Sequence, residues 1–512
     1  MTSFDGGELN ISADVAASSL VAEESNADEI YVSAGSSLDL DSENLKTSQL
    51  TTYGTTKLGV DYTADAKVGN GGVLDLVSST LTGDVTLADN STLSFNVDNV
   101  EEAAGGKVGG SVKTYLSEGG SAVINPVIGI DAGEGTYSFA DEVSVKEGSV
   151  DRGEEGLKLS NSNTLYNVEF GDTQNTLNVS KKDSGEVASA VVNAGGTVSN
   201  ANTVNAWVGG NSDASSLTGA SRAMAEHLNT LAQTDQGALV NAVTALAPET
   251  AAMVQSNATE TANQVFAAVG SRLSGGSIVT GNEGMSSGDS IFKRGAMWVQ
   301  GLFNHSKADD TRKARGFDAD SEGIAFGAEK YVNDDVKLGI GYAYTSSDID
   351  GFMRKTDVDT HTAIAYGEYK PSNWFVNGIA TYGWSDYSEK KNVAGMPVSA
   401  DYDVDSIGLQ AMTGYNIDLC GAMLTPEAGL RYVNIRQDGY RDSAGQKVGE
   451  NTSDILTGVV GASLKKDFAL DNGMNLRPEA RLAMTYDMFN DDSSSVVTLA
   501  NGSAYTVNGQ AL

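Results

Sequence analysis

Cysteine is almost absent from this chain, which contains a single one, Cys420, among 512 residues. One thiol excludes an internal disulfide framework and any zinc site built from several cysteines. The sequence also lacks a run of about 18 apolar residues, so it predicts no transmembrane helix. The strands of a membrane β-barrel, however, leave only weak alternating signals, and the low hydropathy does not exclude a protein of that kind.

Basic residues are few: 33 Lys and Arg stand against 68 Asp and Glu, a net charge of −35. This balance argues against a nucleic-acid-binding protein, because affinity for phosphates comes from clustered Lys and Arg. Residues 1–300 carry 38 acids and 14 bases (−24), and residues 301–512 carry 30 and 19 (−11). Conversely, 24 of the 36 aromatic residues lie in 291–512. The chain therefore changes character near residue 290.

Residues 1–215 contain short alternating apolar runs every 8–12 residues, separated by polar turns, which is typical of many short strands. Residues 28–40 align without a gap onto residues 83–95, and a looser copy spans residues 168–179. One such unit cannot bury its apolar side alone, whereas stacked copies can. We therefore expect a right-handed parallel β-helix, with a β-sandwich as the alternative.

The apolar period changes to 3.6 residues in the stretch 216–290, which predicts a helical linker. Ala220, Met224 and Leu228 share the face of a first helix. The last helix is expected over about 249–273, where the glycines of Ser274-Gly275-Gly276 end it.

Residues 291–512 contain long alternating strands joined by short and long connections in turn, as in outer-membrane β-barrels. The strand Trp374–Trp384 has aromatic residues at both ends of one face and small apolar residues between them. Lipid-facing girdles have this pattern. The predicted girdle residues are Trp374, Tyr382, Trp384 and Tyr415. The fold class is therefore all-β with a short helical linker, ending in an antiparallel transmembrane barrel. Its candidate strands are 296–305, 317–331, 335–347, 357–370, 373–387, 402–418, 422–436, 453–468, 474–488 and 495–507.

A Pro-Glu-Ala segment occurs twice in this region, beginning at Pro426 and at Pro478. Alternation places the charged residues of both copies on one face of their strands. A charge on the lipid side costs a few kcal/mol, so this face is expected to line the lumen, where the charges can pair. The predicted lumen residues, with a structural role, are Glu427, Arg431, Glu479 and Arg481.

The ordered set of parts resembles an autotransporter of the type V secretion pathway. The motifs that carry the resemblance are Leu246-Ala247-Pro248, Val269-Gly270-Ser271-Arg272-Leu273, Met297-Trp298-Val299-Gln300-Gly301 and the strand Phe317–Ala328. The resemblance covers about 240–512. It implies a twelve-stranded barrel in the outer membrane of a Gram-negative cell, a helix in its lumen and an N-terminal passenger at the cell surface. Its implied partners are outer-membrane lipid, the outer-membrane assembly machinery and an unidentified host or surface ligand.

The chain departs from the family pattern at both ends. Met1-Thr2-Ser3-Phe4-Asp5 has no basic or apolar segment of a signal peptide. We count ten candidate strands instead of twelve, and the chain ends in Gln510-Ala511-Leu512 rather than in an aromatic residue. These departures predict a fragment that lacks both ends, with a gap or distorted closure between the first and last strands.

Motifs that could carry catalysis are weak. The pattern Gly284-Met285-Ser286-Ser287-Gly288 lies in a linker rather than in a strand–turn–helix. His227, His305 and His361 are scattered, and the acids of 401–405 are not followed by the glycine of a calcium loop. We expect no enzyme, metal or cofactor. The leading function is a secretion and surface-display protein with an adhesin-like passenger. The alternatives are a serine protease or esterase in an upstream portion, and a porin-like channel.

Overall fold

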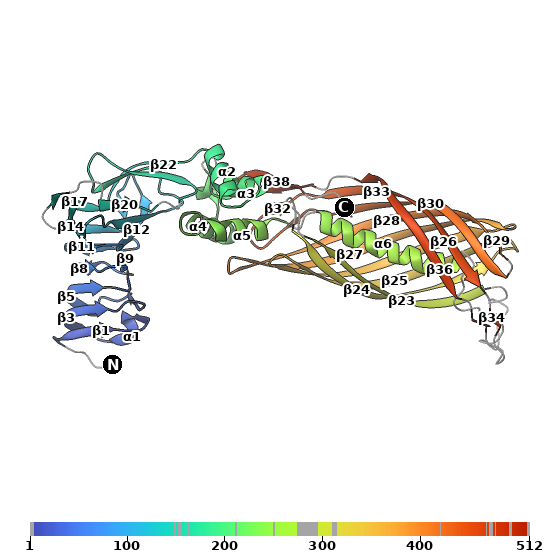
Figure 1. The fold of residues 1–512 in the computed structure, drawn as a ribbon, viewed down its shortest axis with the longest axis horizontal. Helices are drawn as coiled ribbons and strands as arrows, with labels where there is room; N and C mark the ends of the chain where they lie inside the picture. Colours follow the sequence, from blue (N-terminus) through green and yellow to red (C-terminus); the bar gives the residue numbers. More distant parts are fainter. Residues whose placement is uncertain are drawn as a thin grey trace. The chain divides into compact units, whose positions relative to one another are not determined.

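The computed structural model describes residues 5–147, 150–151, 156–160, 163–209, 212–248, 251–273, 295–309, 315–419, 421–466, 468–469, 475–476, 478–490 and 494–508. The chain divides into two compact units, Met1–Val240 and Asn241–Leu512 (Figure 1). Every described helix is too short or too polar to cross a membrane. The motif at Gly284–Gly288 lies outside the described residues.

The N-terminal unit is a parallel β-helix. One sheet has the order β1 (Glu8–Ile11), β3 (Ser25–Val32), β5 (Leu45–Thr52), β8 (Asp65–Val68), β11 (Val85–Ala88), β14 (Lys107–Tyr115), β10 (Thr80–Thr82) and β7 (Tyr62–Thr63), and β17 (Ala140–Ser144) also pairs with β14. The other has the order β2 (Val15–Ala16), β4 (Ser37–Leu40), β6 (Thr55–Leu58), β9 (Val73–Asp75), β12 (Thr92–Asn99), β15 (Ala122–Ile128) and β20 (Leu157–Leu159). Neighbouring strands along both orders are parallel. The β-sandwich alternative is therefore wrong, because sandwiches are built from antiparallel sheets. The right hand of the helix stays a prediction.

The core of this unit consists of columns of aliphatic side chains, one from each coil. Residues of a column are direct partners in the strand register and are almost completely buried. Two columns are Ile30, Leu50, Ala66 and Val85 in one sheet and Leu74, Leu93 and Ile124 in the other. Stacking hides the apolar face of each coil between its neighbours, which is why the repeat needs several copies to fold.

The internal repeat corresponds to one crossing from the first sheet to the second. Residues 28–40 contain the end of β3 and all of β4, and residues 83–95 contain β11 and the start of β12. The looser copy at 168–179 was wrongly included. It falls on β21 (Tyr166–Phe170) and β22 (Thr176–Lys181), which pair antiparallel with each other, and β22 also pairs antiparallel with β16 (Gly135–Ser138). Alternation alone does not distinguish a coil from a hairpin.

Aspartate side chains join successive coils outside the ladders. Asp61 accepts a hydrogen bond from the backbone N–H of Thr80 at 2.7 Å, and Asp65 accepts one from Asp84 at 2.9 Å. Asp84 in turn accepts one from Ser111 at 2.9 Å and pairs with Lys113. Part of the acid excess of the unit therefore satisfies backbone donors at the coil corners.

Helices begin earlier than the linker boundary at residue 216 suggests. After β22 come α2 (Ser184–Asn193), α3 (Val198–Trp207), η2 (Ala214–Ser216) and α4 (Gly219–Thr234). The first two start with complete capping boxes, formed by Asp183 with Glu186 and by Thr197 with Asn200. Both boxes are sequence signals for a helix start, and they do not depend on apolar periodicity.

Helix α4 covers the last complete coil. The side-chain amide of Gln233 accepts from the backbone N–H of Ile128 at 2.7 Å and donates to the Ile128 carbonyl at 2.8 Å. These are the two hydrogen bonds that a further strand would exchange with β15. Asn229 donates to the same carbonyl at 2.8 Å. The helix thus satisfies a sheet edge that would otherwise be open for pairing with another chain.

The C-terminal unit is a curled antiparallel sheet that surrounds a helix (Figure 1). Helix α5 (Gln236–Leu246) leads into it, and α6 (Ala251–Leu273) is the helix inside. The sheet has the order β23 (Gly295–Ala308), β24 (Phe317–Tyr331), β25 (Val336–Gly351), β26 (Arg354–Tyr369), β27 (Trp374–Val393), β28 (Met396–Tyr415), β30 (Ala422–Gln437), β33 (Asn451–Lys466) and β36 (Glu479–Asn490), with β29 (Ile417–Asp418) on β30. We call the end with the turns at 332–335 and 370–373 the short-turn end. The opposite end, where the long strands β27 and β28 are joined at 394–395, is called the long-hairpin end.

The tenth predicted barrel strand, 495–507, is wrong. It is split into β37 (Ser494–Thr498) and β38 (Ala504–Asn508), a hairpin that continues a small sheet through β32 (Lys447–Val448) and β31 (Tyr440–Arg441). The cause is the turn at Asn501-Gly502, where Gly502 has a φ of +81°. Among the described residues, β23 and β36 are not paired with each other.

The faces of the barrel strands follow the predicted alternation. In β27 and β28 exposed and buried residues alternate almost without interruption. Trp374, Tyr382 and Trp384 lie on the exposed face of β27, and Tyr415, the register partner of Trp374, is exposed on β28. The structure thus puts the four predicted girdle residues on the outer surface, where they can meet lipid.

Replacing Gln233 by leucine is expected to loosen the end of the β-helix. The change leaves the N–H and the carbonyl of Ile128 with fewer partners, and an unsatisfied buried group costs about 1–3 kcal/mol. Hydrogen exchange of the full chain should show faster exchange in β15. The exposed Thr230→Ala on the same helix is the control, and equal exchange in both variants would contradict the role of Gln233.

Acid is expected to weaken the coil corners. Hydrogen bonds from Lys113 and from the Ser111 backbone lower the pKa of Asp84 below its ordinary value. A lowered pKa in the folded state gives stability that is present above the unfolded pKa and is lost as the pH falls through the folded one. Exchange in β14 should therefore accelerate on acidification in the native chain. In Asp84→Asn this part of the pH dependence should disappear.

Candidate functional site

The candidate site is the lumen of the barrel, which α6 occupies. The helix contacts β23, β24, β26, β27, β28 and β30. Val265, Phe266 and Val269 are buried almost completely. Gly408 of the wall leaves room for Phe266, because a Cβ at this position would lie 2.9 Å from the ring. The apolar face of α6 therefore packs closely against the wall, and the helix fills the lumen.

The C-terminal end of α6 is held by buried barrel side chains, which we call the α6 clasp: Trp298, Glu329, Lys337 and Tyr366. The guanidinium of Arg272 binds Glu329 at 2.8 and 3.2 Å and lies over the ring of Trp298. Lys337 donates to the Arg272 carbonyl at 2.7 Å. Tyr366 donates to Glu329 at 3.1 Å and accepts from the Trp298 indole at 2.7 Å.

A second set of barrel side chains holds the C-terminal end of α5. This α5 clasp consists of Arg354, Glu389, Lys391, Asp442 and Gln446. Arg354 donates to the carbonyls of Ala245 at 3.1 Å and Ala247 at 2.9 Å. Lys391 lies 3.5 and 3.4 Å from the carbonyls of Leu246 and Ala247. Gln446 donates to the Leu246 carbonyl at 2.9 Å.

Both clasps answer the same requirement. The last four carbonyls of a helix have no partner within it and carry partial negative charge. Inside a barrel these groups meet little water, so barrel donors must satisfy them. The cations are themselves paired: Glu389 lies 3.0 Å from Arg354 and 3.4 Å from Lys391. Lys337 stands beside Glu329 in the other clasp.

The structure brings together some of the predicted lumen residues. Arg481 donates to the buried Glu427 at 2.5 Å, across the two Pro-Glu-Ala copies. Arg431 donates to Gln410 at 2.7 Å and to Asn263 of α6 at 3.2 Å. Glu479 lies at the start of β36, and its side chain is outside the described residues. Neither clasp was predicted from the sequence.

A polar cavity of about 240 Å³ is lined by α6 together with β30, β33 and β36. Glu260 and Asn263 line it from the helix, and Arg431, Thr457 and Asp487 line it from the wall. Thr457 donates to Asp487 at 2.7 Å. Acid, base, amide and hydroxyl groups are thus mixed in one cavity, without a set of three His, Cys, Asp or Glu among the described residues that could hold a metal ion.

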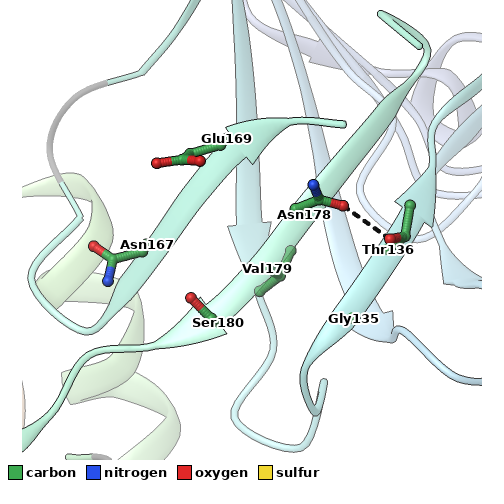
Figure 2. A pocket seen from close by; sticks show the side chains of 7 residues that line it. All are labelled: Gly135, Thr136, Asn167, Glu169, Asn178, Val179 and Ser180. Carbon is green, nitrogen blue, oxygen red and sulfur yellow. Dashed lines mark hydrogen bonds between the residues drawn. The ribbon is translucent and has the colours of Figure 1, made fainter. Parts of the chain in front are cut away.

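The N-terminal unit carries a separate shallow groove of about 340 Å³ on the sheet β16–β22–β21 (Figure 2). Its polar lining consists of Thr136, Asn167, Glu169, Asn178 and Ser180. The hydroxyl of Thr136 bonds to the amide oxygen of Asn178 at 2.8 Å, as the dashed line in Figure 2 shows. The lining residues include one carboxylate and no histidine, lysine or cysteine.

Comparison with known proteins decides the identity of the barrel. Residues 297–512 match the family "Autotransporter beta-domain". The C-terminal part of this chain is an autotransporter β-domain. The domain belongs to the outer membrane, and the N-terminal β-helix is the passenger, exposed at the cell surface.

Relatives support the same family. Over 240 residues the chain is 27% identical to outer membrane protein A of Rickettsia rickettsii, covering 42% of this chain and 11% of that protein. Over 220 residues it is 24% identical to outer membrane protein B of Rickettsia typhi, covering 38% of this chain and 13% of that protein. The matches thus span only about a tenth of the length of these relatives.

Two solved autotransporter domains are similar to part of the chain. The translocator domain of NalP from Neisseria meningitidis is 14% identical with a TM-score of 0.38, covering 51% of this chain and 92% of that one. The β domain of the Bordetella autotransporter Brka is 19% identical with a TM-score of 0.33, covering 40% and 87%.

Replacing Glu329 by alanine is expected to destabilise the filled barrel. The change leaves Arg272 and Lys337 buried without their carboxylate, and breaking a buried ion pair in this way costs about 3–5 kcal/mol. The temperature at which the folded barrel loses its compact mobility on a detergent gel should fall. Glu322→Ala on the exposed face of the same strand is the control. Equal unfolding temperatures for the two variants would contradict the α6 clasp.

Proposed function

We propose that the autotransporter β-domain translocates its own passenger across the outer membrane and then anchors it at the surface, with α6 filling the lumen. The observation that carries the proposal is the position of α6. It contacts the wall on six strands and is held at its C-terminal end by the α6 clasp. The chain that leads to the passenger leaves by the long-hairpin end, at the α5 clasp. That end therefore faces outward, with the short-turn end in the periplasm.

An adhesin-like role of the passenger is part of the proposal. A stacked β-helix is a rod that presents long polar faces. The antiparallel sheet β16–β22–β21 of the same unit adds the polar groove in Figure 2. In this proposal the barrel has no catalytic role. An enzyme carried by a longer passenger and a porin-like channel are the competing functions. The filled lumen argues against the channel, because a freely conducting pore needs open space along its axis.

The test is expression from the gene in a Gram-negative host. Protease added to intact cells should remove the passenger but leave the barrel, and the cells should adhere to host surfaces only while residues 1–215 are present. Deleting 251–273 should raise the conductance of the purified barrel in planar bilayers, because it removes the filling helix. A passenger that protease reaches only after the cells are permeabilised would refute surface display. Conductance as high with α6 as without it would favour the channel.

A further inference from the structure

The α5 clasp sets where the outgoing chain comes to rest. Resting on the proposed translocation function, we propose that Arg354, Lys391 and Gln446 are positioning residues that recognise the C-terminal end of α5 and stop the chain with Ala245–Ala247 at the outer mouth of the barrel. The stop distinguishes a helix end from the extended chain that precedes it. The passenger is thereby held on the barrel in one register.

The acceptors explain this selectivity. Carbonyls at the end of an α-helix all point along the axis toward the C-terminus, and the last turn has no internal partners for them. Ala245, Leu246 and Ala247 therefore offer three consecutive carbonyls to one cluster of donors. In an extended chain successive carbonyls point to opposite sides, so three in a row cannot meet the same cluster.

The sequence fixes the place of this helix end. Pro248 has no N–H to continue the helix, and its ring would clash with the carbonyl of Thr244, four residues earlier. A residue before proline, here Ala247, disfavours the helical conformation. The last helical hydrogen bond of the turn is donated by the Ala247 N–H to Val243 at 3.1 Å. The acceptor group therefore stands at one defined position along the chain.

The donors are a built site rather than surface contacts. Lys391, Glu389, Asp442 and Gln446 are nearly or fully inaccessible, and 8% of the Arg354 side chain is exposed. These five residues come from three parts of the unit: β26, β27 and the segment between β31 and β32. Gln446 is oriented by Asp442, to which it donates at 2.7 Å, and by the hydroxyl of Tyr505 on β38.

Burial makes the stop depend on the chain. A buried cation is tolerated when its hydrogen bonds are satisfied, and the carbonyls of α5 complete those of Arg354 and Lys391. Without the helix end these donors would face only their acids in a site shielded from water. The clasp is therefore complete only when Ala245–Ala247 have arrived, which is the property of a stop rather than of a passive pore lining.

The experiment measures the register directly. In the full chain with Cys420 replaced by serine, Ala247→Cys reports how often this position leaves the clasp, through its rate of reaction with a membrane-impermeant maleimide. The test variant is E389Q/K391M, which removes one buried base and one buried acid and leaves the net charge unchanged. The matched control is D386N/K390M, with the same changes at exposed positions of the same strand.

We expect maleimide labelling at least about tenfold faster in E389Q/K391M than in the control, since charged hydrogen bonds of this kind are lost. The unfolding temperature on a detergent gel should be similar in both, so that the barrel is folded. Q446L, which removes one neutral donor, should give a smaller increase in the labelling rate. K391R, which keeps a cation at this position, should label as slowly as the parent chain. If E389Q/K391M does not fold, Q446L against the control decides the proposal.

Equal labelling in the test and control variants, or a fast rate in the parent chain, would overturn the stop. The measurement is made on detergent-purified chain as well as on intact cells. Failure of surface display would appear as a passenger that protease does not reach on cells, whatever the labelling in detergent. The failure of the stop and the failure of the proposed function are therefore separate results.

Discussion

The structure depends on one constraint: every backbone donor or acceptor that regular secondary structure leaves open must find a partner, because lipid and a filled lumen offer little water. Neighbouring barrel strands meet it by long in-register ladders, and among the described residues only the edges of β23 and β36 are not joined to each other. Helices cannot meet it at their ends, and there the side chains of the wall take over. Lys337 serves α6, and Arg354, Lys391 and Gln446 serve α5.

In the passenger, acidic side chains rather than basic ones satisfy open backbone groups. At corners between its coils, carboxylates such as those of Asp61 and Asp65 accept hydrogen bonds from backbone N–H groups. At the end of the β-helix both a donor and an acceptor are left on Ile128, and the amide of Gln233 is suited to serve both. The acid excess of the passenger and the buried bases of the barrel are thus two solutions to one problem.

The fold was largely predictable because its signals are local. Alternation in Trp374–Trp384 and in the repeat at 28–40 depends only on neighbours in the chain, and the structure confirms strands there. The errors have local causes as well: the Asn501-Gly502 turn divides a predicted strand, and the capping box at Asp183 starts a helix that periodicity did not indicate. The clasps were not predictable, since their contacts join Arg354 to a residue 109 positions away and Gln446 to one 200 positions away.

Strands depend on signals between neighbouring residues, whereas the clasps depend on contacts between residues far apart in the sequence. A strand can form wherever alternation permits, but a clasp exists only when distant segments have closed around a helix end. Glu389 alone would be a buried acid at a high cost, and it becomes tolerable only beside Arg354 and Lys391. The buried charged side chains of the α5 clasp are therefore stabilised only when the wall has assembled and the end of α5 is in place. This coupling makes the helices that the barrel holds a part of its fold.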